Sequence, residues 1–127
     1  MQLIVAFDYS FSNGHPSEPD SLHYLHPDDP KALNPYEQAI VSVGNIVLPY
    51  DSDEQVPVLG FAARVMKDTV FGPIQHCFHV VDHEVHGVKG ILEAYRKSFE
   101  RIRLHGPTLL NLVIDEAGKI ARKRAEE

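Results

Sequence analysis

Apolar residues along the chain fall into short runs and helical stripes that predict alternating strands and helices. The first run, Leu3 to Phe7, is uninterrupted and ends at Asp8, which is the pattern of a strand buried on both faces. Asn13 and Gly14 then break the chain direction. Residues 56–63 and residues 77–81 carry further short apolar runs, which predict a second and a third buried strand.

Three segments have apolar residues at helical spacing. The stretch from Asn34 to Glu37 predicts a helix start, because it offers an N-cap Asn, a Pro at the first position and a Glu at the third. This helix is expected to end near Leu48, a second to span residues 88–102, and a third to begin at residues 106–108. The inward faces are expected to be Tyr36, Ala39, Ile40, Val43, Ile46 and Val47, then Ile91, Leu92, Tyr95, Phe99 and Ile102, then Leu109, Leu112, Val113, Ala117, Ile120 and Ala121. The order strand, helix, strand, strand, helix, helix predicts an α/β layer fold.

A long polar loop, residues 15–34, separates the first strand from the first helix. Loops longer than about 12–15 residues in compact domains are usually functional or disordered. We expect His23 and Tyr24 to anchor the middle of this loop to the core. In a second polar stretch, YDSDEQ, we expect Asp51 and Asp53 to form a solvated turn.

Composition narrows the class of protein. The chain has 127 residues, which predicts a single domain over residues 1–127. A net charge of −6 disfavours binding to nucleic acid. The single cysteine, Cys77, excludes an internal disulfide and fits a reducing compartment. No segment reaches the roughly 20 apolar residues needed to cross a bilayer, and none resembles a signal peptide. We therefore expect a soluble cytoplasmic domain without direct membrane insertion.

Three oxygen-bearing side chains, Asp8, Ser10 and Ser12, follow the first strand at alternate positions. The carboxyl ends of strands are where open α/β sheets place their ligand sites. Mg²⁺ takes oxygen ligands in octahedral geometry and usually keeps several waters. One carboxylate and two hydroxyls leave such an ion undercharged, so the carboxylate of a partner protein can complete the shell. The alternative interpretation is a polar turn in which the serines satisfy backbone groups.

Other chemistries fit the residues less well. Four residues of HVVDHEVH, at positions 79, 82, 83 and 86, have spacings seen among zinc ligands, and Cys77 could join them. The HExxH pattern of zinc proteases is missing, so we expect a polar loop there. A phosphatase of the haloacid dehalogenase type would use Asp8 as its nucleophile, but Ser10 stands where that family needs a second Asp. The phosphate loop and the GxSxG elbow are absent, so we expect no enzyme and no catalytic residues.

Several blocks together resemble the copine family, whose characteristic domain is of the von Willebrand factor A type. The same blocks are similar to the copine-like domain of plant RING-type ubiquitin ligases. They are DYSFSNG (8–14), SLHYL (21–25), NPYEQAI (34–40), YDSD (50–53), VLGFAAR (58–64), GILEAYR (90–96) and IRLHGPT (102–108). They follow the order of the family at similar spacing across nearly all of the chain.

The resemblance implies a Rossmann-like, doubly wound fold and a metal-ion-dependent adhesion site. Asp8, Ser10 and Ser12 match its first block, and Thr108 matches the next site residue. Copines more often have Thr at the position of Ser10, a change that keeps the hydroxyl. The expected cofactor is Mg²⁺ or Mn²⁺, and the expected partner is a protein that donates a carboxylate.

The resemblance to copines also implies a role in calcium-linked membrane signalling, with membrane association through modules that this chain lacks. Two alternatives remain open. The chain could be an adaptor fragment of a copine-like ubiquitin ligase, or a degenerate assembly domain without metal.

The chain also departs from the family pattern. Domains of this type usually continue into a fourth buried strand and a further acidic residue, so we expect an amino-terminal portion truncated before that strand. The first strand would then be an open apolar edge, and we expect self-association through it. Ala62 stands where the family usually has Gly, which we expect to be a small packing change.

Overall fold

At the centre of the computed structural model, which describes residues 3–29, 31–51, 53–67, 70–105 and 110–126, two short strands run parallel. Strand β1 (Val5–Asp8) pairs with β3 (Val58–Phe61), and Asp8 lies opposite Phe61. The two-residue strand β6 (Phe78–His79) pairs antiparallel with β3 on its other side. The strand order is therefore β1-β3-β6, with the expected first strand at an edge of the described sheet.

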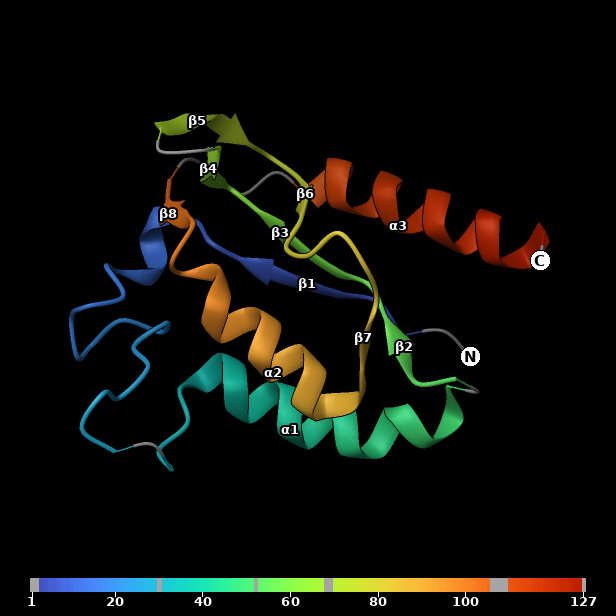
Figure 1. Ribbon diagram of the computed structural model, residues 1–127, viewed down its shortest axis with the longest axis horizontal. Helices are drawn as coiled ribbons and strands as arrows, with labels where there is room; N and C mark the ends of the chain where they lie inside the picture. The colour runs from blue at the N-terminus through green and yellow to red at the C-terminus, as the bar shows by residue number, and fades with distance from the viewer. Residues whose placement is uncertain (1–2, 30, 52, 68–69, 106–109, 127) are drawn as a thin grey trace.

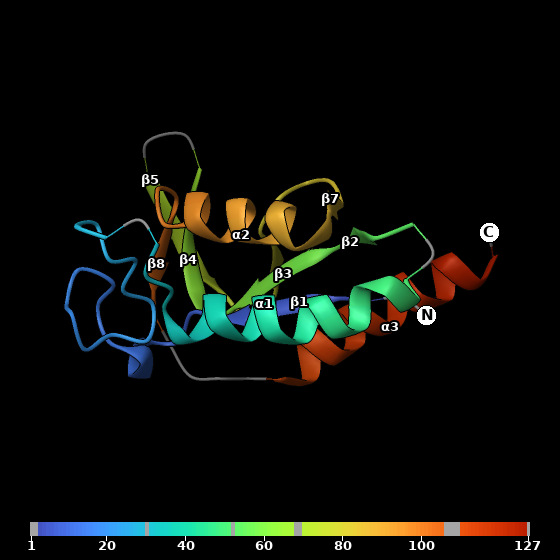
Figure 2. The same ribbon diagram turned by 90° about the horizontal axis from the view of Figure 1, so that it is seen from below.

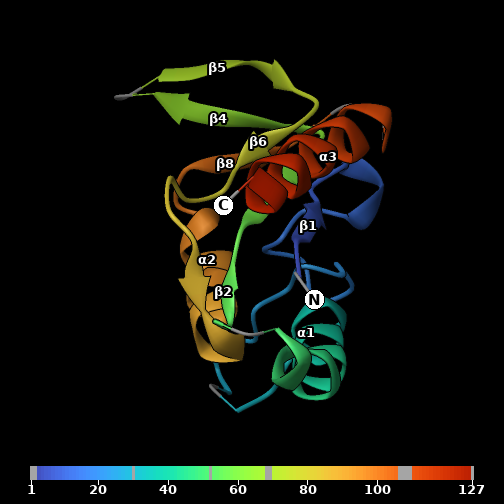
Figure 3. The ribbon, with the colours of Figure 1, turned by 90° about the vertical axis from the view of Figure 1, so that its right-hand side faces the viewer.

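Helices cover this sheet on both faces, as Figures 1 and 3 show. Helices α1 (Pro35–Val47) and α2 (Gly87–Ser98) pack side by side on one face. Helix α3 (Leu110–Glu126) lies on the other face, where Val113 packs with Phe61 and Ala62. The described residues thus form an α/β fold, as predicted. They contain one parallel strand pair, so the doubly wound parallel sheet remains a prediction, as does the single-domain division of the chain.

A second sheet was not predicted. Strand β4 (Ala63–Lys67) lies between β5 (Val70–Gln75) and β8 (Ile102–Leu104), and both pairings are antiparallel. Strand β8 lies next to the polar loop at one end of the molecule, as Figure 2 shows. The small strands β2 (Gln55–Val56) and β7 (Val85–His86) form an antiparallel pair at the other end.

The predicted strand over residues 56–63 is broken at two positions. Pro57 has no backbone N–H and separates β2 from β3. Ala62 has a φ of +62° and separates β3 from β4, so the chain turns there into the second sheet. A Gly at this position would take this left-handed conformation without a steric penalty from Cβ. The backbone conformation at Ala62 is therefore one that an L-residue rarely adopts, and the expected small packing change stays a prediction.

Helix α1 begins as predicted but buries a different face. The Asn34 side chain accepts from the Glu37 N–H, and the Glu37 side chain accepts from the Asn34 N–H, which completes a capping box. Ala39, Val43 and Ile46 were expected inside but face solvent. The buried positions are Glu37 and Gly44, because α2 approaches so closely that a Cβ at Gly44 would lie 2.7 Å from Val88 Cγ2.

The other two helices also differ from their predicted stripes. Helix α2 ends at Ser98, and Ile102 is buried from strand β8 instead of from the helix. Helix α3 exposes Leu112 and Ala121, although both were expected to point inward. The predicted helix start at residues 106–108 lies outside the described residues. No described helix is long and apolar enough to cross a membrane.

Strand β1 has one buried face and one open face. Phe7 is buried in the main core with Tyr95 and Ile91, whereas Ala6, which points the opposite way, is exposed. The prediction of burial on both faces was therefore wrong at Ala6. The apolar run alone does not show whether other elements cover each face. Tyr9, the residue after the strand, is fully buried and extends the inner face toward the polar loop.

Candidate metal centre

The predicted metal ligands lie where strand β1 leaves the sheet. The Tyr9 N–H still donates to the Phe61 carbonyl at 3.0 Å, and the short helix η1 (Phe11–Asn13) follows. This turn brings Asp8, Ser10 and Ser12 together at the carboxyl end of the strand. The predicted fourth ligand, Thr108, lies outside the described residues.

Hydrogen bonds set the geometry of the three described candidate ligands. The Ser10 N–H donates to Asp8 Oδ1 at 2.8 Å, which orients the carboxylate toward the turn. The hydroxyl oxygens of Ser10 and Ser12 are 3.1 Å apart. Ser10 is buried and Ser12 is exposed, so the pair reaches from the core to solvent.

These residues fit a small hard cation. Ligands at 2.0–2.1 Å in octahedral geometry place adjacent oxygens about 3 Å apart, close to the separation of the two hydroxyls. The polar-turn alternative requires the serine hydroxyls to bond backbone groups, and within the described residues neither of them does. The two hydroxyls bond each other, and the Ser10 hydroxyl also accepts from the Asn13 amide. Asp8 Oδ1 accepts from Ser10, whereas the other carboxylate oxygen of Asp8 has no hydrogen-bond partner among the residues that the structure describes.

Asn13 closes the turn from inside and was not predicted to belong to the site. Its amide nitrogen donates to the carbonyls of Asp8 and Ser10, both at 3.0 Å. Its amide oxygen accepts from the Tyr36 hydroxyl at 2.7 Å, which ties the turn to α1. Burial, with the Asp8 charge as a smaller cause, raises the pKa of Tyr36 to about 12. This phenol therefore remains a hydrogen-bond donor at neutral pH.

His23 supports the turn from the core side. Its Nε2 lies 2.6 Å from the Asp8 carbonyl oxygen and its Nδ1 lies 2.6 Å from the Tyr95 hydroxyl. The imidazole is fully buried, with Tyr36 stacked at 4.2 Å between ring centroids and Tyr9 stacked at 5.5 Å. Desolvation lowers the pKa of His23, with the Asp8 carbonyl and charge opposing it. A neutral ring with its proton on Nε2 satisfies both contacts.

A chain of buried polar groups continues behind His23. The Asn34 amide donates to the Tyr95 hydroxyl at 2.9 Å, and the Tyr9 hydroxyl lies 2.8 Å from the Ser98 hydroxyl. Burial raises the pKa of both Tyr9 and Tyr95 far above the usual range. The prediction that His23 anchors the polar loop was right, whereas Tyr24 is half-buried and its ring contacts His26 within the loop. The sequence signal was a short apolar block, LHYL, inside an otherwise polar loop.

The Asp51 carboxylate lies elsewhere and has a structural contact. It was expected in a solvated turn but is buried, and its Oδ2 accepts from the Leu3 N–H at 3.1 Å. It therefore fastens the start of the chain ahead of β1. Asp53 is exposed, as expected.

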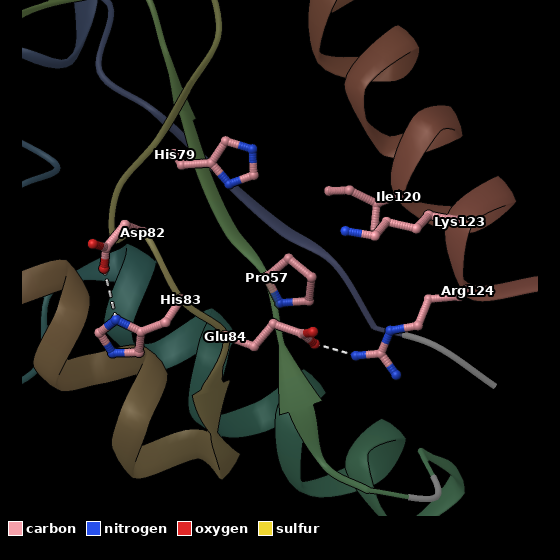
Figure 4. Close-up of a pocket in the computed structure, with 8 residues that line it drawn as sticks. All are labelled: Pro57, His79, Asp82, His83, Glu84, Ile120, Lys123 and Arg124. Atoms are coloured by element: carbon pink, nitrogen blue, oxygen red, sulfur yellow. Dashed lines mark hydrogen bonds and ion pairs between the residues drawn. The ribbon is translucent and has the colours of Figure 1, made fainter. Parts of the chain in front are cut away.

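The His-rich stretch at residues 79–86 does not form a metal cluster. His79 pairs with Glu116 at 3.0 Å and Asp82 pairs with His83 at 2.9 Å. Figure 4 shows Glu84 joined instead to Arg124 of α3, across a cavity of about 310 Å³. In the part of the chain that the structure describes, no three His, Cys, Asp or Glu residues are grouped so that they could hold a metal ion.

Comparison with known proteins gives related sequences over nearly the whole chain. The sequence profile of the Copine family matches residues 21–127. Protein BONZAI 1 of Arabidopsis thaliana is 40% identical over 125 residues, which cover 95% of this chain and 21% of that protein. Protein BONZAI 2 of the same plant is 41% identical over 125 residues, covering 95% of this chain and 20% of that protein. The chain therefore spans about a fifth of the length of these relatives.

Proposed function

The chain belongs to the copine family, as its sequence blocks predicted, and we propose that it is a non-enzymatic protein-interaction domain. It holds Mg²⁺ or Mn²⁺ through Asp8, Ser10, Ser12 and Thr108, and a partner protein donates a carboxylate to the open coordination position. The doubly wound A-type topology, a cytoplasmic location and a link to calcium and membrane signalling belong to the same proposal.

The observation that carries the proposal is the arrangement of oxygens at the end of β1. The Ser10 and Ser12 hydroxyls are 3.1 Å apart, and the Asp8 carboxylate is oriented by the Ser10 N–H. One carboxylate neutralises half the charge of a divalent cation, so an acidic side chain of a partner gains an attraction that a neutral one lacks. When the metal is bound, it supplies this attraction and leaves positions for exchangeable ligands.

Metal titration tests the proposal. Mn²⁺ is titrated into the wild type and into Asp8→Asn, which keeps the carbonyl-type oxygen but removes the charge. The expected result is at least about a tenfold weaker dissociation constant for Asp8→Asn, since charged oxygen ligands dominate the affinity of hard cations. Asp20→Asn is the control, because Asp20 is an exposed acid in the polar loop that follows this turn. Equal Mn²⁺ affinity in wild type and Asp8→Asn would contradict the proposal.

A second candidate function, assembly without metal, is favoured by the edge position of β1. Within the described sheet, β1 pairs with β3 alone. The N–H groups of Val5 and Tyr9 point to the β3 side, so that of Ala6 points outward. An outward N–H beside the exposed Ala6 side chain at a strand edge can pair with another strand.

Sedimentation at increasing concentration tests this second candidate. The expected result is reversible association of the wild type and a monomer for Ala6→Pro, which removes an outward donor and leaves the β3 ladder intact. A wild type that remains monomeric throughout would exclude assembly through this edge. The origin of the chain from a ubiquitin ligase remains an untested prediction.

A further inference from the structure

The carbonyl of Asp8 is held by side chains where the sheet ends. The next residue, Tyr9, still bonds backbone partners, because its N–H donates to Phe61 and its carbonyl accepts from His105. The Asp8 carbonyl instead accepts from His23 Nε2 at 2.6 Å and from the Asn13 amide at 3.0 Å. The peptide that carries the candidate metal ligand is therefore oriented by groups outside the ladder.

The His23 ring is itself fixed by three different elements. Tyr95 of α2 donates to Nδ1 at 2.6 Å, and Tyr36 of α1 stacks on one face of the ring. Tyr9, directly after β1, stacks nearby. The donor order is set by chemistry: the Asn34 amide donates to the Tyr95 hydroxyl, this hydroxyl donates to Nδ1, and Nε2–H donates to the Asp8 carbonyl.

We propose that His23 is a positioning residue for the metal loop, the turn that carries Asp8, Ser10 and Ser12. Tyr95 holds the His23 ring in the orientation that fixes the Asp8 peptide. The inference rests on the proposed function for its metal readout. It assigns His23 and Tyr95 a role beyond core packing, because the chain of donors ends on the backbone of a candidate ligand. Groups that orient metal ligands in this way typically change metal affinity by about 10–100-fold when they are removed.

A purely structural role for Tyr95 is the alternative, and Tyr9 provides the matched control. Both tyrosines are fully buried, and each hydroxyl makes a hydrogen bond inside the core. The Tyr9 hydroxyl is hydrogen-bonded to the Ser98 hydroxyl, which donates to the Tyr95 carbonyl and makes no bond to His23. Tyr9→Phe therefore removes a buried hydroxyl even closer in sequence to Asp8, but leaves the donor chain to its carbonyl intact.

Amide hydrogen exchange of the metal-free protein tests the inference without any metal. The probes are the amides of Ser10, Asn13 and Gly14, which bond within the turn. The Leu59 amide in β3 reports global unfolding. We expect Tyr95→Phe to speed exchange of the turn amides by about tenfold relative to Leu59. For Tyr9→Phe the same ratio should stay within twofold of wild type. Equal ratios in the two variants would overturn the inference.

Mn²⁺ titration of the same variants supplies the second readout. We expect Tyr95→Phe to weaken Mn²⁺ binding about tenfold and Tyr9→Phe to leave it within twofold. His23→Gln, which can still donate to the Asp8 carbonyl, should bind more tightly than His23→Phe, which keeps a ring but has no donor. Equal affinity in these two variants would also overturn the inference. If the wild type itself binds no Mn²⁺, the proposed function fails, while the exchange experiment still decides whether His23 positions the loop.

Discussion

Two polar clusters lie at opposite ends of the β1–β3 pair, and they use many of the same residue types. The cluster at the carboxyl end of β1 contains His23, Asn34 and Glu37, all of which are buried. The cluster at the other end lies around Pro57 and contains His83, Glu84 and Asp82 (Figure 4). All three of these side chains are exposed. The first is surrounded by aromatic rings from three elements, whereas the second joins the end of α3 to a loop.

The difference shows that burial, more than composition, decides what a polar group contributes. A buried donor or acceptor that loses its partner costs roughly 1–3 kcal/mol, so the members of the first cluster constrain one another. Exposed ion pairs are screened by water and contribute little. Arg124 illustrates the second case. It forms ion pairs with both Asp53 and Glu84, but both pairs lie at the surface. The candidate metal ligands lie beside the buried cluster, which contacts them through the hydrogen bond between His23 Nε2 and the Asp8 carbonyl.

The largest expected effect comes from crowding the rings behind the metal loop. A Cβ at Gly60 would lie 2.6 Å from Tyr9 Cε2 and 2.7 Å from Phe78 Cζ. We expect Gly60→Ala to lower the free energy of unfolding by about 2–3 kcal/mol, because the added Cβ overlaps two buried rings that would have to shift. Urea denaturation followed by circular dichroism measures this change.

Gly118→Ala is the matched control on α3, near the exposed cluster. A Cβ there meets only the end of the flexible Arg122 side chain, at 3.3 Å. Because Ala favours a helix over Gly by up to about 1 kcal/mol, we expect a gain in stability. If Gly60→Ala and Gly118→Ala lowered the free energy of unfolding by similar amounts, the proposed contrast between the two regions would be wrong.

A smaller effect is expected from Glu37→Ala. Glu37 is buried and its carboxylate accepts from the Asn34 N–H at 3.0 Å and pairs with Arg96. Its removal leaves a buried N–H without its partner and destroys the capping box, at a cost of about 2 kcal/mol. Thermal unfolding measures the change. Arg124→Ala, which breaks two exposed ion pairs, should leave the melting temperature unchanged; a matching drop there would refute the interpretation.

The smallest effect is a dependence of stability on pH through His23. Burial lowers the pKa of His23 in the folded protein, so the unfolded chain takes up a proton first as the pH falls below about 6.5. The Asp8 charge opposes this shift, and the three facing tyrosines remain neutral. Stability is therefore present above the unfolded pKa and lost as pH falls toward the folded pKa.

Unfolding measured from pH 7 to pH 5 checks this prediction. We expect the free energy of unfolding to fall more in the wild type than in His23→Gln, by up to about 1 kcal/mol per pH unit. The sign of the change in the free energy of unfolding with pH is decisive, because a His that gained a negatively charged partner on folding would stabilise the protein at low pH instead. An identical pH profile for the two proteins would contradict the assignment of His23 as a buried neutral ring.

Local patterns predicted local structure well. The capping box at Asn34 and Glu37 was read from adjacent residues and is present, as is the turn that groups Asp8 with Ser10 and Ser12. Such features depend on residues within one turn of each other, so sequence spacing is enough to identify them. The family could be recognised for a similar reason, because its blocks are short and contiguous.

The buried network could not be predicted in the same way. His23 is hydrogen-bonded to the hydroxyl of Tyr95, which lies 72 positions away in the sequence, and Asn34 is hydrogen-bonded to the same hydroxyl from 61 positions away. The exposed face of α1 was also misassigned, because the close approach of α2 at Gly44 decides which side is covered. No spacing rule links residues this far apart.

Spacing between neighbouring residues was enough to predict that a strand delivers Asp8 to a turn with two hydroxyls, that a capped helix starts at Asn34, and that the chain is a copine relative. The packing of distant segments determines which polar groups are withdrawn from water and therefore which side chains hold that turn in place. The physical reason is that propensity and capping act between neighbours, whereas desolvation depends on every segment that packs around a residue.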